Sequence, residues 1–140
     1  MPALPEQEAR RRFAAARVAR LATVRPEERP HIVPIVFAMD GDRVYSIADP
    51  KPKRGLDLLR HRNIARQAAV SLLVDEYHEP WEGIWWVRAD GSARVVESGM
   101  ERDTAVELLR AKYREYAEWT TPFGAATVIS IERWSSWTMS

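Results

Sequence analysis

The chain has no cysteine among its 140 residues. This absence excludes disulfides, thiolate nucleophiles and cysteine-based zinc or iron–sulfur sites, and it disfavours a small secreted scaffold. An excess of charge of one sign is also missing, because 21 basic and 20 acidic residues leave a formal net charge of +1. Proteins that coat nucleic acid usually carry a strongly basic domain, so the composition disfavours that function.

Long hydrophobic runs are lacking as well, and no stretch approaches the ~20 apolar residues that a bilayer-spanning helix needs. The N-terminal segment is too polar for a signal peptide, and its acidic residues Glu6 and Glu8 argue against a transit peptide. We therefore expect a cytoplasmic protein that does not enter a membrane. Neither a Ser/His/Asp nucleophile set nor a glycine-rich phosphate loop can be assembled, so any chemistry must come from a cofactor.

The length and the 46% hydrophobic content suit one domain spanning residues 1–140. Apolar periodicity and turn residues predict helices at 5–17, 53–62 and 98–119, and strands at 18–24, 30–39, 43–48, 68–77, 84–97 and 126–137. This order predicts a mainly β (α+β) fold, with six antiparallel strands in a small barrel and three flanking helices.

Three local patterns make sharper predictions. Residues 32–39 are apolar almost without alternation, which indicates a strand covered on both faces. Asn63 is a plausible stop for the second helix. Ser98 and Glu101 have the spacing of a capping box, in which the two side chains satisfy backbone donors at the start of a helix.

A basic turn follows the third predicted strand, at Lys51, Lys53 and Arg54. It precedes a predicted helix, where unpaired backbone N–H groups carry partial positive charge, so the pattern favours binding of a phosphorylated ligand. A solvated basic surface is the alternative. The cluster Arg60, His61 and Arg62 stands at the other end of that helix and is interpreted as structural, because positive charge complements a helix C-terminus.

The aromatic and acidic residues of the 75–86 region admit several interpretations. Trp85 and Trp86 are neighbours on a strand and must point to opposite faces, so one can serve the core and the other a groove or a partner. Core packing of both is the favoured alternative. Trp81 lies in a loop and is a candidate lid over a bound ring. The nearby acidic residues and His78 match no closed metal site, so no metal is predicted.

The sequence resembles a known superfamily over residues 17–137. The run RLATVRPEERPHIVPIVFAMDGDRVYSIADPKPKRGLDLLRHRNIA, followed by SLLVDE and WVRADGSARVV, is similar to the pyridoxamine 5'-phosphate oxidase-like (PPOX class) split barrels. Within them it most resembles the small oxidoreductases that use the deazaflavin coenzyme F420. The resemblance implies an FMN-binding split-barrel fold and a homodimer with cofactor sites along the subunit boundary.

The resemblance also implies site residues. The cofactor ring would lie along Val33, Pro34, Ile35 and Val36, its ribityl chain along Ser46, Ile47 and Ala48, and its phosphate and acidic tail on Lys51, Lys53 and Arg54. Trp81, as a lid, and Trp85, as a groove residue, are added to this predicted site from their positions in the sequence. True pyridoxamine phosphate oxidases carry further basic and polar residues for the substrate phosphate, which are not found here. Pyridoxine chemistry is therefore disfavoured, while FMN remains an alternative to F420.

The implied activity is hydride transfer between the deazaflavin and a small electrophilic molecule. A non-catalytic protein that stores or senses a flavin-like cofactor is the second hypothesis, and binding of single-stranded nucleic acid is a disfavoured third. No catalytic acid or base is assigned. Tyr45, Tyr77 and His78 remain open possibilities.

Overall fold

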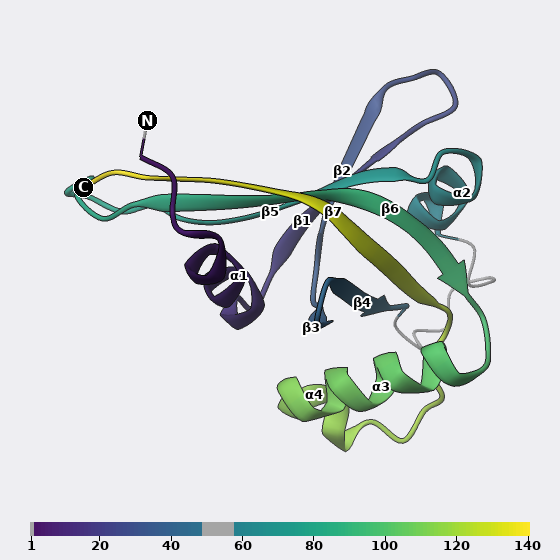
Figure 1. Ribbon diagram of the computed structural model, residues 1–140. Helices are drawn as coiled ribbons and strands as arrows, with labels where there is room; N and C mark the ends of the chain where they lie inside the picture. Colours follow the sequence, from purple (N-terminus) through teal and green to yellow (C-terminus); the bar gives the residue numbers. More distant parts are fainter. Residues whose placement is uncertain (1, 49–57) are drawn as a thin grey trace.

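The computed structural model describes residues 2–48 and 58–140, and within them the chain is mainly β (Figure 1). The helices are α1 (Glu6–Ala15), α2 (Leu59–Arg66), α3 (Met100–Lys112) and α4 (Arg114–Glu118). The strands are β1 (Ala19–Val24), β2 (Pro30–Ile35), β3 (Ala38–Asp40), β4 (Arg43–Ile47), β5 (Ala69–Glu76), β6 (Trp85–Val96) and β7 (Ala126–Thr138). None of these helices is long and apolar enough to span a membrane.

All seven strands form one antiparallel sheet in the order β2-β1-β5-β6-β7-β4-β3. The prediction of six strands is wrong, because the predicted strand at 30–39 is divided into β2 and β3. These two are the outermost strands of the sheet, yet only Val36 and Phe37 separate them along the chain. The sheet must therefore curl enough to bring the Ile35 end of β2 near the Ala38 end of β3; we call the two linking residues, Val36 and Phe37, the crossover.

The curled sheet encloses a core filled from one end by α1. In β1, side chains alternate between buried and more exposed positions, as expected for a strand with one face on the core. Phe13 of α1 is fully buried, and its ring centroid lies 5.1 Å from that of Phe37 and 5.2 Å from that of Trp134. The helix predicted at 5–17 is confirmed, and its apolar stripe packs into this core.

The outer face of β2 is not covered by this chain. Ile32 is 62% exposed and Pro34 is exposed as well, whereas Ile35 is buried. The prediction that both faces of this strand are covered is thus wrong for the single chain. The reason is that alternate residues of β2 point to opposite faces of the sheet, and the face that carries Ile32 and Pro34 is turned away from the core.

The second and third predicted helices are displaced or divided. Asn63 does not end α2 but is 1% exposed within it, and its amide donates to Thr23 Oγ1 at 3.0 Å. Residues 53–57 of that predicted helix lie outside the described residues. The helix predicted at 98–119 breaks at Tyr113, whose φ and ψ of −117° and 120° are extended and separate α3 from α4.

The predicted capping box does not form. Gly99, with φ of 101°, is the N-cap of α3, and no side chain caps that helix. The Glu101 carboxylate instead receives the Arg94 guanidinium and, at 3.3 Å, that of Arg43. These contacts, Arg94 first, lower the pKa of Glu101. Arg94 and Arg43 therefore bind the carboxylate that the capping box would have directed to a backbone N–H.

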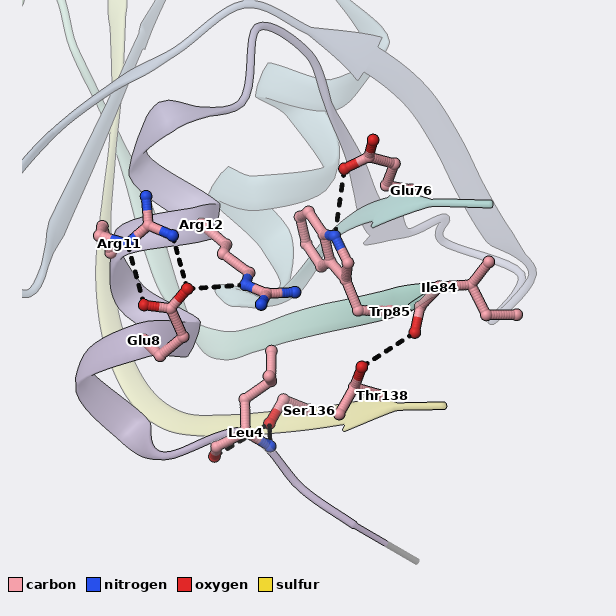
Figure 2. A network of polar contacts seen from close by, with 9 residues as sticks. All are labelled: Leu4, Glu8, Arg11, Arg12, Glu76, Ile84, Trp85, Ser136 and Thr138. Carbon is pink, nitrogen blue, oxygen red and sulfur yellow. Dashed lines mark hydrogen bonds and ion pairs between the residues drawn. The ribbon is translucent and has the colours of Figure 1, made fainter. Parts of the chain in front are cut away.

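The N-terminal segment and α1 are fastened to the ends of β6 and β7 (Figure 2). Leu4 N–H donates to Ser136 Oγ at 3.0 Å. Trp85 is largely buried beneath α1, where its indole N–H donates to Glu76 at 3.2 Å and the Arg12 guanidinium lies 5.3 Å from its ring. Arg11 and Arg12 also bond Glu8 and lower its pKa to about 2.

Candidate functional site

A cleft of ≈ 490 Å³ lies between two parts of the chain. One is the crossover with the neighbouring ends of β2 and β4, and the other is the break between α3 and α4. Its sheet side is formed by Pro34, Ile35, Val36, Ser46 and Ile47. Its helix side is formed by Tyr113, Tyr116 and Trp119, and Val18, Arg60 and Glu115 complete the lining. The volume falls in the range that holds a small organic molecule or the ring portion of a cofactor.

The floor of the cleft is the crossover, where the chain leaves one edge of the sheet for the other. Side chains bond the backbone there: Phe37 N–H donates to Tyr113 Oη at 3.1 Å, and Ser46 Oγ donates to the Val36 carbonyl at 3.1 Å. Buried backbone polar groups must find partners, and here hydroxyl groups provide them. The floor is therefore held in place by Tyr113 and Ser46.

Tyr113 also joins the crossover to the end of α1. Its hydroxyl lies 3.0 Å from the Phe37 carbonyl and 2.9 Å from the Arg17 carbonyl. One hydroxyl has one proton to donate, so these two carbonyls share it while an oxygen lone pair receives the Phe37 N–H. Burial raises the pKa of Tyr113, which keeps the hydroxyl protonated.

Lys112 reinforces the same junction. Its Nζ donates to the Ala14 and Ala16 carbonyls at 3.0 and 2.7 Å and lies 3.9 Å from the centroid of the Phe37 ring. In return, Arg17 donates to the Lys112 carbonyl at 2.8 Å. Burial, followed by the nearby positive charge of Arg17, lowers the pKa of Lys112 to about 8. Hydrogen bonds in both directions thus join the C-terminal ends of α1 and α3 beside the cleft.

The helix wall of the cleft is a cluster of mutually packed aromatic rings. The Tyr116 ring meets those of Trp119 and Phe123 edge to face at 4.9 and 5.1 Å, and Trp119 and Phe123 stack at 5.7 Å. Arg110 donates to the Trp119 carbonyl at 3.1 Å. Such packed rings form a stiff apolar surface against which a flat aromatic ligand can stack.

The cleft brings together five of the residues predicted to bind a cofactor, namely those on its sheet side. Val33 does not line it and packs against the core. Ala48 is also buried beside the cleft, where its N–H and C=O bond Ala125 and Gly124. Lys51, Lys53 and Arg54 lie outside the described residues.

The two tryptophans predicted to complete the site lie elsewhere. Trp81 is 62% exposed in the loop between β5 and β6, and Trp85 is buried beneath α1. Trp85 and Trp86 do differ in burial, as neighbours on a strand should. Neither tryptophan of the predicted site contributes to the cleft of its own chain.

The open catalytic possibilities, Tyr45, Tyr77 and His78, do not line the cleft either. Tyr45 is 4% exposed in the core, and Tyr77 is 58% exposed. His78 Nδ1 lies 2.8 Å from the Pro80 carbonyl. Among the described residues, no group of three or more carboxylate or imidazole side chains is arranged to hold a metal ion.

Six lining residues were not predicted as site residues, namely Val18, Arg60, Tyr113, Glu115, Tyr116 and Trp119. Arg60 was interpreted as structural, and Tyr113 and Tyr116 were interpreted as the core-facing side of one long helix. Tyr113, Tyr116 and Trp119 recur at intervals of three residues, which could have indicated an aromatic wall. The break at Tyr113 that turns this wall toward the crossover has no comparable signal in the sequence.

A second depression, the outer groove, lies on the solvent face of β1, β2, β5 and β6. It measures ≈ 510 Å³, and its lining includes Ile32, Leu73, Tyr77 and Trp86 together with the charged residues Arg20, Asp75 and Arg88. The exposed Ile32 and Tyr77 make this face more apolar than a solvated sheet surface usually is.

A family model confirms the predicted superfamily. The model described as pyridoxamine 5'-phosphate oxidase matches residues 5–138. This chain belongs to the pyridoxamine 5'-phosphate oxidase family. Among proteins of curated function, none is similar enough in sequence to count as a relative.

Solved structures share the fold of this family member over nearly its whole length. A conserved hypothetical protein from Mycobacterium tuberculosis has a TM-score of 0.77 at 18% identity, covering 96% of this chain and 85% of its own. A FAD-binding protein from Mesorhizobium loti has a TM-score of 0.74 at 20% identity, covering 96% and 95%. A conserved protein of unknown function from Corynebacterium diphtheriae has a TM-score of 0.70 at 22% identity, covering 99% and 98%.

Proposed function

We propose that this protein is a cytoplasmic oxidoreductase that binds the deazaflavin coenzyme F420 and transfers hydride between it and a small electrophilic substrate. The observation that carries the proposal is the cleft between the crossover and the aromatic rings of Tyr113, Tyr116 and Trp119. A structural neighbour described as FAD-binding supports a flavin-type cofactor. FMN is the alternative cofactor, and a carrier or sensor of the same ring is the alternative role.

The lining fits a planar redox ring in shape and chemistry. Pro34, Val36 and Ile47 offer apolar contact on one side, and the indole of Trp119 offers a stacking surface on the other. Bound deazaflavin would supply the hydride chemistry, and the protein's part is to orient the ring and exclude water. Arg60 adds a positive charge to the lining that suits an anionic ligand.

The phosphate and acidic tail of the cofactor are assigned in this proposal to Lys51, Lys53 and Arg54. Lys51 is four residues beyond Ile47 in the sequence, and Ile47 lines the cleft. A phosphate group and an acidic tail both favour guanidinium and ammonium partners. In this proposal the ring binds in the cleft and the phosphate and acidic tail bind the basic turn.

We further propose that the protein is a homodimer formed through the outer groove. Ile32 and Tyr77 offer apolar area, while Arg20 and Asp75 at the same surface carry opposite charges. A two-fold interface pairs each surface with itself, so a patch holding both charges can be self-complementary. In such a dimer, Trp81 would have to act across the subunit boundary, because it does not line the cleft of its own chain.

The cofactor proposal is tested by titrating the purified protein with F420 and with FMN side by side, following quenching of tryptophan fluorescence. We expect tighter binding of F420, and tighter binding of FMN would replace the cofactor. Turnover of the reduced cofactor with a panel of enones and nitroaromatic compounds then tests the enzyme. Tight binding without oxidation by any acceptor would favour the carrier.

Reversing the charge of Lys53 tests the phosphate assignment. Lys53→Glu should weaken either cofactor at least about tenfold, because it removes a charge-assisted contact and adds repulsion. Arg29→Glu in the turn between β1 and β2 changes the net charge equally and serves as the control. Equal affinities of the two variants would remove Lys53 from the site.

The dimer is tested by sedimentation of Ile32→Asp and of Met100→Asp. Met100 is 83% exposed at the start of α3, outside the outer groove, so it is a matched control. We expect the wild type and Met100→Asp to sediment as dimers and Ile32→Asp as a monomer. Dimers in all three proteins would place the interface elsewhere.

A further inference from the structure

The break between α3 and α4 places one hydroxyl at the junction of three segments. Tyr113 Oη lies within 3.1 Å of Phe37 N, of the Phe37 carbonyl and of the Arg17 carbonyl. Tyr113 is in neither helix, since its backbone is extended between Lys112 and Arg114. Its amide still bonds the Leu109 carbonyl at 2.9 Å, so the end of α3 carries Tyr113 and the break redirects the chain that follows it.

Both faces of the cleft depend on this residue. The Tyr113 ring is part of the helix wall, and its hydroxyl bonds the backbone of Phe37 in the crossover, which forms the floor. The neighbouring residue Val36 lines the cleft and is held through its carbonyl by Ser46. Tyr113 therefore ties the helix wall directly to the floor of the cleft.

The hydrogen-bond inventory of the hydroxyl argues against a role as a proton donor in a reaction. Its single proton is directed at the two backbone carbonyls, and it accepts the Phe37 N–H as well. A catalytic acid must offer its proton to the substrate. The geometry leaves Tyr113 the task of fixing the position of backbone atoms.

We propose that Tyr113 is a positioning residue that fixes the crossover and thereby sets the width of the cleft for a planar ring. The claim about the crossover stands on the contacts of the chain alone, and its consequence for cofactor binding rests on the proposed function. A narrow, pre-formed slot lowers the ordering cost of binding a flat ligand. Loss of the hydroxyl should therefore weaken ring binding even though the aromatic wall remains.

The experiment compares Tyr113→Phe with Thr138→Val. Thr138 also uses a hydroxyl to bond a backbone carbonyl, that of Ile84 at 3.1 Å, but at the far end of the sheet. Amide hydrogen exchange of Phe37 is measured in each cofactor-free protein. We expect exchange at Phe37 to be about tenfold faster or more in Tyr113→Phe, as for loss of a buried hydrogen bond, and unchanged in Thr138→Val.

Binding of F420 and FMN is then measured for both variants beside their melting temperatures. Tyr113→Phe should bind the cofactor roughly tenfold more weakly, while Thr138→Val binds as the wild type does at a similar melting temperature. Unchanged exchange at Phe37 would overturn the proposal, and so would faster exchange with unaltered affinity. If the wild type binds neither cofactor, the proposed function fails, and the exchange measurement still decides whether Tyr113 fixes the crossover.

Discussion

The α1 end and the α4 end of the curled sheet are both covered by helices that present aromatic side chains, but only the α1 end is solid. Beneath α1, Phe13 is fully buried against Phe37 and Trp134. Beside α4, the rings of Tyr116 and Trp119 pack on each other and leave a cleft toward the strands. The same kind of residue forms core at one end and a cleft wall at the other.

The difference originates in the backbone. Beneath α1, the paired strands β6 and β7 satisfy their own backbone groups, so helix side chains can fill the space. The cleft instead borders the crossover, whose Phe37 ring packs beneath α1 but whose backbone is bonded by the hydroxyl groups of Tyr113 and Ser46.

The largest expected effect distinguishes the solid end. Phe13→Ala should lower the free energy of unfolding by about 3–5 kcal/mol, because it leaves a cavity among fully packed rings. Urea unfolding followed by circular dichroism measures the change. A loss below about 1 kcal/mol would mean that the α1 end is no better packed than the cleft end.

Trp119→Ala is the corresponding change at the cleft end. The indole is only partly buried, so we expect a smaller loss of stability than for Phe13→Ala and a cofactor affinity at least about tenfold weaker through loss of stacking. Equilibrium titration of the folded variant gives the affinity. Wild-type affinity in Trp119→Ala would leave the aromatic wall without a binding role.

Two serines allow a matched comparison of the ends. Ser46 bonds the Val36 carbonyl at the crossover, and Ser136 bonds the backbone of Leu4 near α1. Removing either hydroxyl by Ser→Ala should lower stability by about 1 kcal/mol. Only Ser46→Ala should also weaken cofactor binding, and an equal effect of both variants on binding would contradict the distinction between the ends.

The smallest expected effect is a pH dependence at the junction of the two ends. The pKa of Lys112 is about 8 in the folded protein against 10.5 for an ordinary lysine, because burial disfavours its charge. The unfolded chain therefore binds more protons between these values, and stability from this group rises with pH across about 8 to 10.5.

The control for that dependence is Lys112→Arg, which keeps its charge over the whole range. The free energy of unfolding of the wild type relative to this variant should increase between pH 8 and pH 10, as measured by urea unfolding at several pH values. A difference that stays constant would show that Lys112 titrates as an exposed lysine does.

Much of the secondary structure could be predicted because it is encoded locally. The stripe of Ala9 and Phe13 predicted α1, and alternation and turn residues predicted the strands on either side of Asp40 and Gly41. The division of residues 30–39 was missed because the uninterrupted apolar run has no local break. The two pieces are needed at opposite edges of the sheet, a requirement that arises only when the sheet curls.

The strand residues of the candidate site could also be predicted. The resemblance indicated Pro34, Ile35, Val36, Ser46 and Ile47, and these line one cleft. Trp85 was expected there because an aromatic ring on a strand suits either face, but α1 covers the face it occupies.

The sequence by itself determined the class of fold, the family, the absence of thiol chemistry and the strand residues of the cleft, since each follows from composition, short-range pattern or resemblance. Only the tertiary structure decided that Tyr113, Tyr116 and Trp119 face those strands. It also decided that hydroxyl groups from β4 and the α3–α4 break hold the crossover. The physical reason is that the unpaired backbone groups at 36–37 arise from the curling of the sheet, and residues far along the chain must satisfy them.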